Sequence, residues 1–244
     1  MSEIINEPAE TIVEVDSKPI EKPTILHCIF RIVFGIAFLL GVIFGVAGTL
    51  NWQSGWIYFS ANVIFLIASV PVMYIYNPEM LKRKFPKDTK RFDKIFLAVY
   101  IPIFYSEIII AALGERFDVS GEFSLITVIA ASVFYTIAFT LWLWAVAKNN
   151  NFEMTVRIQH DRGHKVCSSG PYKFVRHPAY TAGVIMFVAT PIALSSLWAL
   201  IPAGVLVIAL LIRTKLEDDM LINELDGYKE FTEVTKYRII PFVW

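Results

Sequence analysis

Cysteine is scarce in this 244-residue sequence, which has only two, and neither belongs to a CxxC pair. No disulfide framework and no cysteine-based zinc site can be built from them. His160 and His164 have i, i+4 spacing, but Gly163 lies between them and no third ligand is evident, so we expect no metal. The sequence also lacks Gly-x-Gly, GxxxxGK(S/T) and HExxH motifs, which leaves Rossmann, P-loop and zincin sites unsupported.

An excess of either charge is also missing, because 22 basic residues balance 22 acidic ones. Without a basic field, we expect no nucleic-acid partner. Hydrophobic residues make up 56% of the chain, above the roughly 45–50% of soluble domains, and the mean hydropathy is +0.56. This composition indicates a membrane protein. The segment 1–23 is polar and lacks the apolar core of a signal peptide, so we expect a flexible tail there.

Long apolar runs dominate the rest of the chain. Four of them have about the 20 residues that a helix needs to cross about 30 Å of hydrocarbon. They are Leu26–Leu50, Trp52–Tyr76, Ile95–Leu113 and Phe123–Ala147. A fifth region, Ala179–Ile212, is interrupted by Pro191 and by Leu194-Ser195-Ser196. We predict that this region folds as a short helical hairpin, and one long bent helix is the alternative.

The distribution of basic residues favours the hairpin. Arg116 is the only Lys or Arg in the three short connectors near Asn51, at Gly114–Glu122 and near Ser195. With six crossings, all other basic residues fall on one side, which the positive-inside rule makes cytoplasmic. A single final helix would put the basic C-terminal tail outside. We therefore predict an all-α polytopic membrane helix bundle of about six transmembrane helices, without a Rossmann domain and with both termini cytoplasmic.

Two features inside the apolar runs predict contacts between helices. Gly41 and Gly45 form a small-xxx-small pair, which favours close packing against a neighbouring helix. Glu107 is the only acidic residue that we place within a membrane span. An intramembrane carboxylate is costly and usually functional, which makes a substrate contact one interpretation. Glu107 lies nearer the outer end of its helix, away from the cytoplasmic motifs, so we expect this side chain instead to be protonated or bonded to a neighbouring helix.

An unusually polar loop, Lys148–Pro178, precedes the hairpin. Its motifs are Arg162-Gly163-His164, Ser169-Gly170-Pro171-Tyr172 and Val175-Arg176-His177-Pro178-Ala179-Tyr180. An ordinary positive-inside connector explains the charge, but not the glycine, proline, histidine and tyrosine interleaved just before a helix. Such a loop can present hydrogen-bond donors, stacking faces and backbone amides to a charged ligand at the membrane surface.

A second polar set, Arg213-Thr214-Lys215-Leu216-Glu217-Asp218-Asp219, follows the hairpin. Arg213 and Glu217 share one face of a continuing helix because they are four residues apart. On spacing alone, a solvated surface ion pair is the favoured interpretation.

As an ordered set, the loop motifs and Arg213-x-x-x-Glu217-Asp218-x-x-Leu221 resemble the isoprenylcysteine carboxyl methyltransferase family. Gly227-Tyr228 and Tyr237-Arg238-Ile239-Ile240-Pro241 are similar to the C-terminal ending of that family. The resemblance covers Asn151–Trp244 closely and Asn77–Ala147 more loosely. Related phospholipid N-methyltransferases carry similar Arg-His-Pro and paired-acid motifs.

The resemblance implies a methyltransferase-like region at 148–244, which follows a four-helix transmembrane region at 24–147. The implied cofactor is S-adenosylmethionine, held by the polar loop and by the helix after the hairpin. Arg213 and Glu217 would be catalytic, at the point where the methyl donor meets the acceptor. The family's paired Glu-Glu is Glu217-Asp218 here, which leaves the role of the shorter Asp218 open. The implied cofactor-binding residues are His164, Gly170, Tyr172, Arg176, His177, Tyr180 and Glu217.

The implied acceptor is a prenylated or lipid-like carboxylate that reaches the site from the surrounding membrane lipids. A phospholipid amine is the alternative acceptor. An NADPH-dependent membrane reductase of related helical arrangement is a second alternative, and a scaffold or transport protein without a cofactor is a third. The sequence leaves the oligomeric state open.

Overall fold

Helices make up the regular structure in the computed structural model, which describes residues 22–82, 86–121 and 123–244. No strand occurs in these ranges, so the predicted all-α bundle is confirmed. The predicted flexible tail at 1–23 lies almost wholly outside them. The α-helices are α1 (Ile25–Leu40), α2 (Gln53–Tyr76), α3 (Arg91–Phe117), α4 (Leu125–Lys148), α5 (Pro178–Ala193), α6 (Leu200–Glu224) and α7 (Tyr228–Val234).

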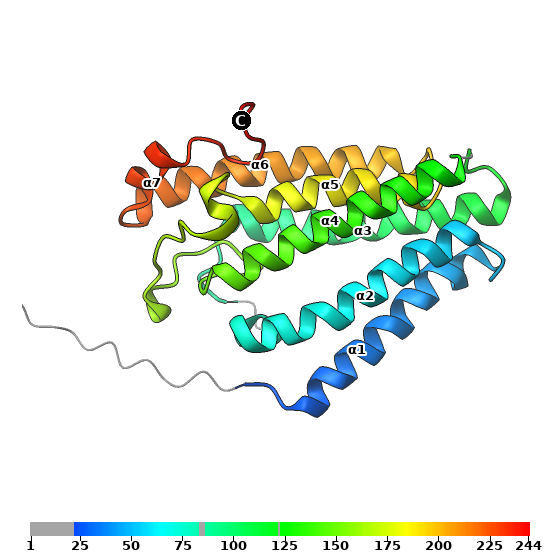
Figure 1. The fold of residues 1–244 in the computed structure, drawn as a ribbon, viewed down its shortest axis with the longest axis horizontal. Helices are drawn as coiled ribbons and strands as arrows, with labels where there is room; N and C mark the ends of the chain where they lie inside the picture. Colours follow the sequence, from blue (N-terminus) through cyan, green and yellow to red (C-terminus); the bar gives the residue numbers. More distant parts are fainter. Residues whose placement is uncertain (1–21, 83–85, 122) are drawn as a thin grey trace, which may run out of the picture.

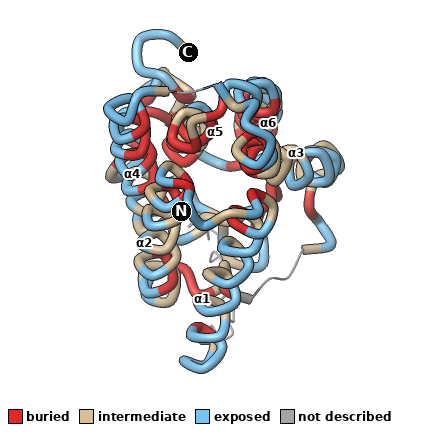
Figure 2. The backbone as a smooth tube through the Cα atoms, turned by 90° about the vertical axis from the view of Figure 1, so that its right-hand side faces the viewer, coloured by how far each residue is buried: buried red, intermediate tan, exposed pale blue. Residues whose placement is uncertain are grey.

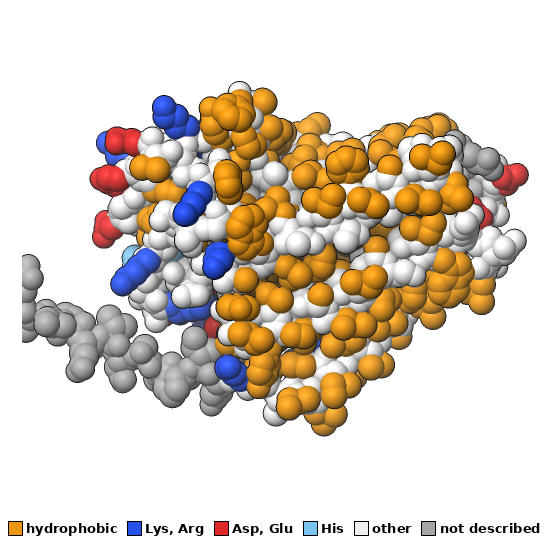
Figure 3. Space-filling view, in the orientation of Figure 1, with side chains coloured by type: hydrophobic (Ala, Val, Ile, Leu, Met, Phe, Trp, Pro, Cys, Tyr) orange, Lys and Arg blue, Asp and Glu red, His pale blue; other side chains and the backbone are white. Residues whose placement is uncertain are grey.

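Helices α3 to α6 run roughly parallel to the long axis of the molecule, α1 and α2 are inclined to them, and α7 and the polar loop lie at one end (Figure 1). Four segments are long and apolar enough to span a membrane: Ile25–Gly45, Gln53–Tyr76, Arg91–Phe117 and Leu125–Lys148. Helix α5 is a shorter apolar helix. On the face shown in Figure 3, hydrophobic side chains cover the helical shafts, and charged side chains gather mainly at the α7 end. These features support an integral membrane protein, whereas six crossings and cytoplasmic termini stay predictions.

The predicted helical hairpin is confirmed, since α5 and α6 pack against each other on either side of a tight turn. Ser195 has a φ of 54° in this turn, and the Ser196 N–H donates to the Pro191 carbonyl over 2.8 Å. The Trp198 indole N–H donates to the Val119 carbonyl over 2.9 Å. The turn is therefore tied to the connector between α3 and α4, at the end of the bundle opposite the polar loop (Figure 1).

The first apolar run forms a membrane-length helical segment, Ile25–Gly45, as the sequence predicts. Within it α1 passes into a π-helical turn at Gly41–Gly45, and the helix ends before Gly48, whose φ is 70°. The close packing predicted at Gly41 and Gly45 is wrong within this chain. A Cβ at either position would have no neighbour within 4 Å outside its own helix. The two glycines instead bound the π-helical turn.

Helices α2 to α6 form the body of the bundle, and α1 packs mainly against α2 at its edge (Figure 2). Helix α4 lies along α5, and α6 contacts both α3 and α5. The polar loop is held against the end of this body. The Val156 N–H donates to Asp93 Oδ2 over 2.8 Å, and the Arg176 N–H donates to the Tyr237 carbonyl over 2.9 Å. The start of α3 and the C-terminal segment thus fix the loop from two sides.

Candidate active site

A cavity of about 340 Å³ extends from the polar loop into the helical bundle. Its wall is built from the loop and from helices α2 to α7. The volume lies at the lower end of the range of small-molecule sites, about 300–1,000 Å³. All predicted site residues except Gly170 line it: His164, Tyr172, Arg176, His177, Tyr180, Arg213 and Glu217. Motifs that are separated in sequence therefore converge on one space.

Arg213 is buried, and its guanidinium is held on several sides. Its Nε lies 2.8 Å from Asp93 Oδ1, and its Nη2 donates to the Met154 carbonyl over 2.8 Å. The guanidinium carbon lies 4.6 Å from the ring centre of Phe96 and 5.3 Å from that of Tyr180. Both distances are within the range of cation–π attraction. The cation is therefore fixed between an acid and two aromatic faces.

Glu217 lies one helical turn beyond Arg213 but has a different partner. Its Oε2 accepts a hydrogen bond from the Tyr180 hydroxyl. The Tyr180 ring in turn stacks on His177, with ring centroids 5.5 Å apart and an interplanar angle of 3°. The solvated Arg213–Glu217 ion pair favoured by spacing alone is wrong, because Arg213 is buried and pairs with Asp93. The two residues instead contribute separate parts of the same cavity wall.

Asp93 is a residue of this site that the sequence did not reveal. It has 0% exposure, pairs with Arg213 and accepts the backbone N–H of Val156 from the loop. It therefore fixes both the guanidinium and the loop. In the sequence it stands just before the apolar run Ile95–Leu113, where an acid is favoured simply by the dipole of a helix start. Asp93 joins the site only because α3 packs against α6, which brings its carboxylate to Arg213.

Asp218, whose role the sequence left open, is fully buried and surrounded by donors. Arg176 donates to its two carboxylate oxygens over 2.8 and 2.6 Å, and Arg238 Nε donates over 2.8 Å. His177 Nε2 lies 3.1 Å away, and the Tyr228 hydroxyl donates over 2.9 Å. Burial alone would raise the pKa of Asp218, but the bonds from Arg176 and His177 hold this pKa below its ordinary value. Asp218 therefore ties the loop, α6 and the C-terminal segment together.

Arg176 lines the cavity, but its guanidinium forms hydrogen bonds with other parts of the protein. Besides the two bonds to Asp218, its Nη1 donates to the carbonyls of Thr235 and Lys236 over 2.9 and 2.8 Å. This arrangement connects the end of the loop to the segment after α7. The cofactor contact predicted for Arg176 stays a prediction.

Gly170 supports the site from outside the cavity. Its φ is 60°, and a Cβ at this position would lie 2.6 Å from Cγ of Lys148. Glycine is required here because any side chain would be strained and would meet α4. The turn that follows buries Tyr172 in the cavity wall, where its hydroxyl accepts a hydrogen bond from Asn149 Nδ2 over 3.3 Å.

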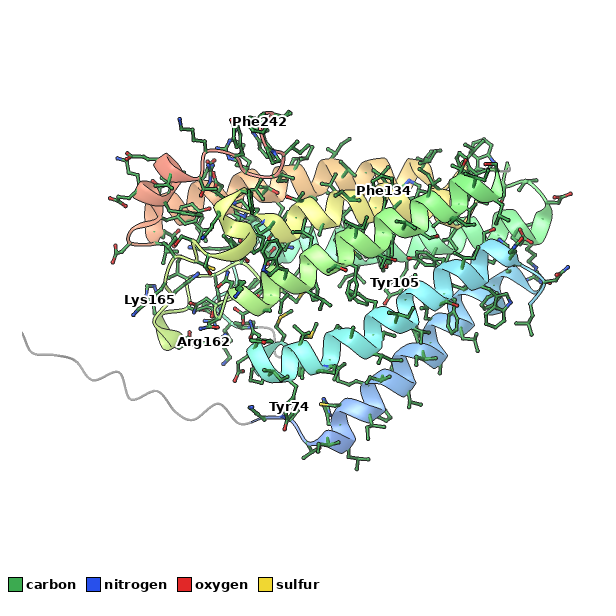
Figure 4. The ribbon with its side chains drawn as sticks, viewed as in Figure 1. Tyr74, Tyr105, Phe134, Arg162, Lys165 and Phe242 are labelled. Atoms are coloured by element: carbon green, nitrogen blue, oxygen red, sulfur yellow. The ribbon has the colours of Figure 1, made fainter. Side chains whose placement is uncertain are left out.

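His164 lies on the polar loop, which also carries Arg162 and Lys165 (Figure 4). Burial lowers the pKa of His164 below its ordinary value, so the ring is neutral near pH 7. Thr155 also lines the cavity, and its buried hydroxyl has no hydrogen-bond partner among the described residues. Buried polar groups are normally paired, so this hydroxyl is available to a ligand.

The chemistry of the wall fits the cofactor that the sequence implies. The Glu217 carboxylate in the wall suits a ligand with a cationic group. The free Thr155 hydroxyl and the neutral His164 ring suit a polar nucleoside or amino-acid group. Both properties belong to S-adenosylmethionine.

Residues 126–225 match the phospholipid methyltransferase family. This segment comprises nearly all of α4, the polar loop, α5 and α6, and it includes every site residue predicted from the sequence. No curated protein matches the chain. The family match, together with the four apolar helices, supports an integral-membrane methyltransferase.

Proposed function

We propose that this chain is an S-adenosylmethionine-dependent methyltransferase that methylates a prenylated or lipid-like carboxylate. One observation carries the proposal: a single cavity joins a polar loop to the interior of a membrane bundle, with Arg213 and Glu217 in its wall. A water-soluble donor and a lipid-soluble acceptor need such a connection in order to meet. The resemblance to isoprenylcysteine carboxyl methyltransferases supports a carboxylate as the acceptor.

The cofactor would be held by the loop and by the start of α5. His164, Tyr172, His177 and Tyr180 would surround it, and Glu217 would bind its amino group through a charge-assisted hydrogen bond. When bound, S-adenosylmethionine supplies a methyl group on a cationic sulfur, and the products are a methyl ester and S-adenosylhomocysteine.

Arg213 would hold the acceptor. Its contacts with Asp93 and Met154 engage Nε and Nη2, which orients the guanidinium and leaves Nη1 to bind the carboxylate. No general base is required, because a carboxylate is already ionised near neutral pH. The chain then contributes alignment and exclusion of water, and alignment of two reactants is worth about 7–11 kcal/mol.

A phospholipid amine is the second candidate acceptor, and the phospholipid methyltransferase match favours it. An ammonium must lose a proton before it can accept a methyl group, so an ionised carboxylate has to take that proton as a base. Glu217 is the candidate base, because Asp218 is already bound to several donors. The Asp93–Arg213 pair would then serve mainly to shape the wall.

The two acceptors are separated by the stability of the product. Purified protein is incubated with membrane extract and S-adenosylmethionine carrying a radiolabelled methyl group, and the products are fractionated. Label released by mild base indicates an ester and supports the carboxylate, whereas base-stable label in polar lipid indicates an amine. Absence of label from every product fraction would contradict methyl transfer. The protein would then have to be interpreted as a reductase, a scaffold or a transport protein.

A further inference from the structure

The cavity continues well beyond the proposed reaction centre. Its wall on α5 extends from Tyr180 to Thr190, ten residues further along the helix, which corresponds to about 15 Å at 1.5 Å per residue. At this inner end the wall also includes Asn62 of α2 and Tyr135 of α4. These three polar side chains lie deep within helices whose other residues are mostly apolar.

The inner end is organised by hydrogen bonds between helices. The Tyr135 hydroxyl donates to Asn62 Oδ1 over 2.8 Å, and Asn62 Nδ2 donates to the Tyr58 carbonyl over 2.9 Å. The hydroxyls of Tyr58 and Thr190 lie 3.5 Å apart. Polar side chains inside a membrane bundle are costly and generally mark a functional path. Here they fix the orientation of an amide and a phenol at the end of the cavity.

Glu107 stands behind this group. On α3 it shares a face with Tyr100 and Phe104, which line the cavity, because the three are spaced three or four residues apart. Glu107 has 0% exposure, and neither carboxyl oxygen has a hydrogen-bond partner among the described residues. Glu107 is not part of the cavity wall itself, but it follows the wall residue Phe104 by about one helical turn, so it lies directly beyond the inner end.

An unpaired buried charge is far more costly than an unpaired neutral group. The Glu107 side chain is therefore a carboxylic acid with an O–H to donate. Bonding to a neighbouring helix, one of the two states expected from the sequence, does not occur within the described residues. The Glu107 O–H has no acceptor among the described residues, and this lowers the stability of the fold unless a ligand supplies an acceptor.

We infer that the inner end of the cavity is a hydrogen-bonding subsite for a neutral oxygen function, such as a hydroxyl or carbonyl, on the acceptor. Glu107 donates to this oxygen, and Asn62 and Tyr135 orient it. The inference rests on the proposed function. It narrows the acceptor to an amphiphile that carries a second polar group about 15 Å from the atom that receives the methyl group.

Two other occupants fit less well. A plain prenyl or acyl chain would leave the Glu107 donor unsatisfied and would place methylenes against the Asn62 amide. An ammonium group would require a charged Glu107 in the interior of the membrane, which is the costly state. A neutral oxygen satisfies the donor without creating a charge.

The test uses two matched pairs of probes with the full-length protein in nanodiscs. One pair is N-acetyl-S-farnesylcysteine and its derivative with a hydroxyl on the terminal isoprene unit. The other is octadecylamine and 12-hydroxyoctadecylamine, in which the nitrogen and the hydroxyl are separated by twelve carbons. Binding is measured at equilibrium, without catalysis, and kcat/KM is measured by transfer of labelled methyl from S-adenosylmethionine. For the head group that binds, we expect the hydroxylated probe to bind about fivefold more tightly, as one net hydrogen bond would allow.

The variants separate the subsite from general packing. Glu107→Gln keeps a donor and should therefore keep the preference for the hydroxylated probe. Glu107→Leu should lose the preference and should raise the melting temperature of the unliganded protein, because it removes an unpaired buried group. Ser132→Ala is the control, since Ser132 is buried and donates within its own helix to the Val128 carbonyl.

Failure of the inference and failure of the proposed function give different results. Equal binding of both members of each pair to the wild-type protein, or a preference that persists in Glu107→Leu, would overturn the subsite even if methyl transfer occurs. A preference lost in Glu107→Gln would also overturn the subsite, because glutamine keeps a donor at this position. A hydroxyl preference in binding without any methyl transfer would keep the subsite and refute the methyltransferase.

Discussion

Replacement of Arg213 by lysine tests the proposed acceptor site most sharply. Lysine keeps the positive charge but has one nitrogen instead of a planar fork. The fork reaches Asp93 through Nε and the Met154 carbonyl through Nη2, and we propose that it binds the acceptor through Nη1. The single ammonium of lysine cannot contact Asp93, the Met154 carbonyl and the acceptor at the same time. Because Asp93 and Met154 belong to the protein and stay in place, the acceptor is the contact that is lost.

The expected loss follows from the strength of these contacts. A hydrogen bond to a charged group contributes about 1.5–3 kcal/mol, and each tenfold change in rate corresponds to about 1.4 kcal/mol. Loss of a buried, charge-assisted contact and of the alignment that it provides therefore predicts a fall in turnover of at least about 100-fold. Affinity for S-adenosylhomocysteine should change by only a few fold, because the proposed cofactor residues are untouched.

Turnover is measured with the purified protein in nanodiscs, labelled S-adenosylmethionine and N-acetyl-S-farnesylcysteine. Cofactor affinity is measured by calorimetry with S-adenosylhomocysteine. Lys215→Arg is the matched control, since Lys215 lies on the same helix but is exposed, and it should behave as the wild-type protein. Near-normal turnover in Arg213→Lys would refute carboxylate binding by Arg213 and make an amine acceptor the better explanation.

Four further predictions follow from the site and the charge pattern. His177→Ala should weaken S-adenosylhomocysteine binding more than tenfold with near-normal detergent stability, and unchanged affinity would leave His177 as a simple helix start. Glu217→Gln should impair both cofactor affinity and turnover, and loss of turnover alone would argue against its contact with the cofactor. Because burial lowers the pKa of His164, the ring is neutral at high pH and gains a charge only as pH falls below about 6.5. Cofactor affinity should therefore be steady at higher pH and decline below that value, and His164→Asn should abolish the decline. A reporter fused after Trp244 should respond only from the cytoplasmic side, and a response from outside would contradict six crossings.

The helices were predictable because their signal is local. A run of about 20 apolar residues specifies a membrane helix whatever it packs against, and the runs ending at Tyr76 and Ala147 lie within a residue of the observed ends of α2 and α4. The hairpin was predictable for the same reason, since Pro191 and Ser195 interrupt the run at the turn. The π-helical turn at Gly41–Gly45 was not predictable, because such a turn leaves the hydropathy of the run unchanged.

The site was predictable in its members but not in its partners. The motifs around His177 and Arg213 identified the wall of the cavity, yet spacing paired Arg213 with Glu217, whereas the structure pairs it with Asp93. That ion pair joins the start of α3 to α6, and no local pattern encodes it. The same holds for Asp218, whose donors come from the loop, from α7 and from the segment after α7. Long-range contacts of this kind become visible only when the elements are placed in space.

The central claim is that the cavity binds S-adenosylmethionine, and calorimetry tests it without knowledge of the acceptor. Purified protein in detergent is titrated with S-adenosylhomocysteine and, separately, with NADPH. The account predicts a saturable heat of binding with S-adenosylhomocysteine, weakened more than tenfold by His177→Ala, and none with NADPH. Binding of NADPH without binding of S-adenosylhomocysteine would contradict it and identify the cavity as the nicotinamide site of a membrane reductase.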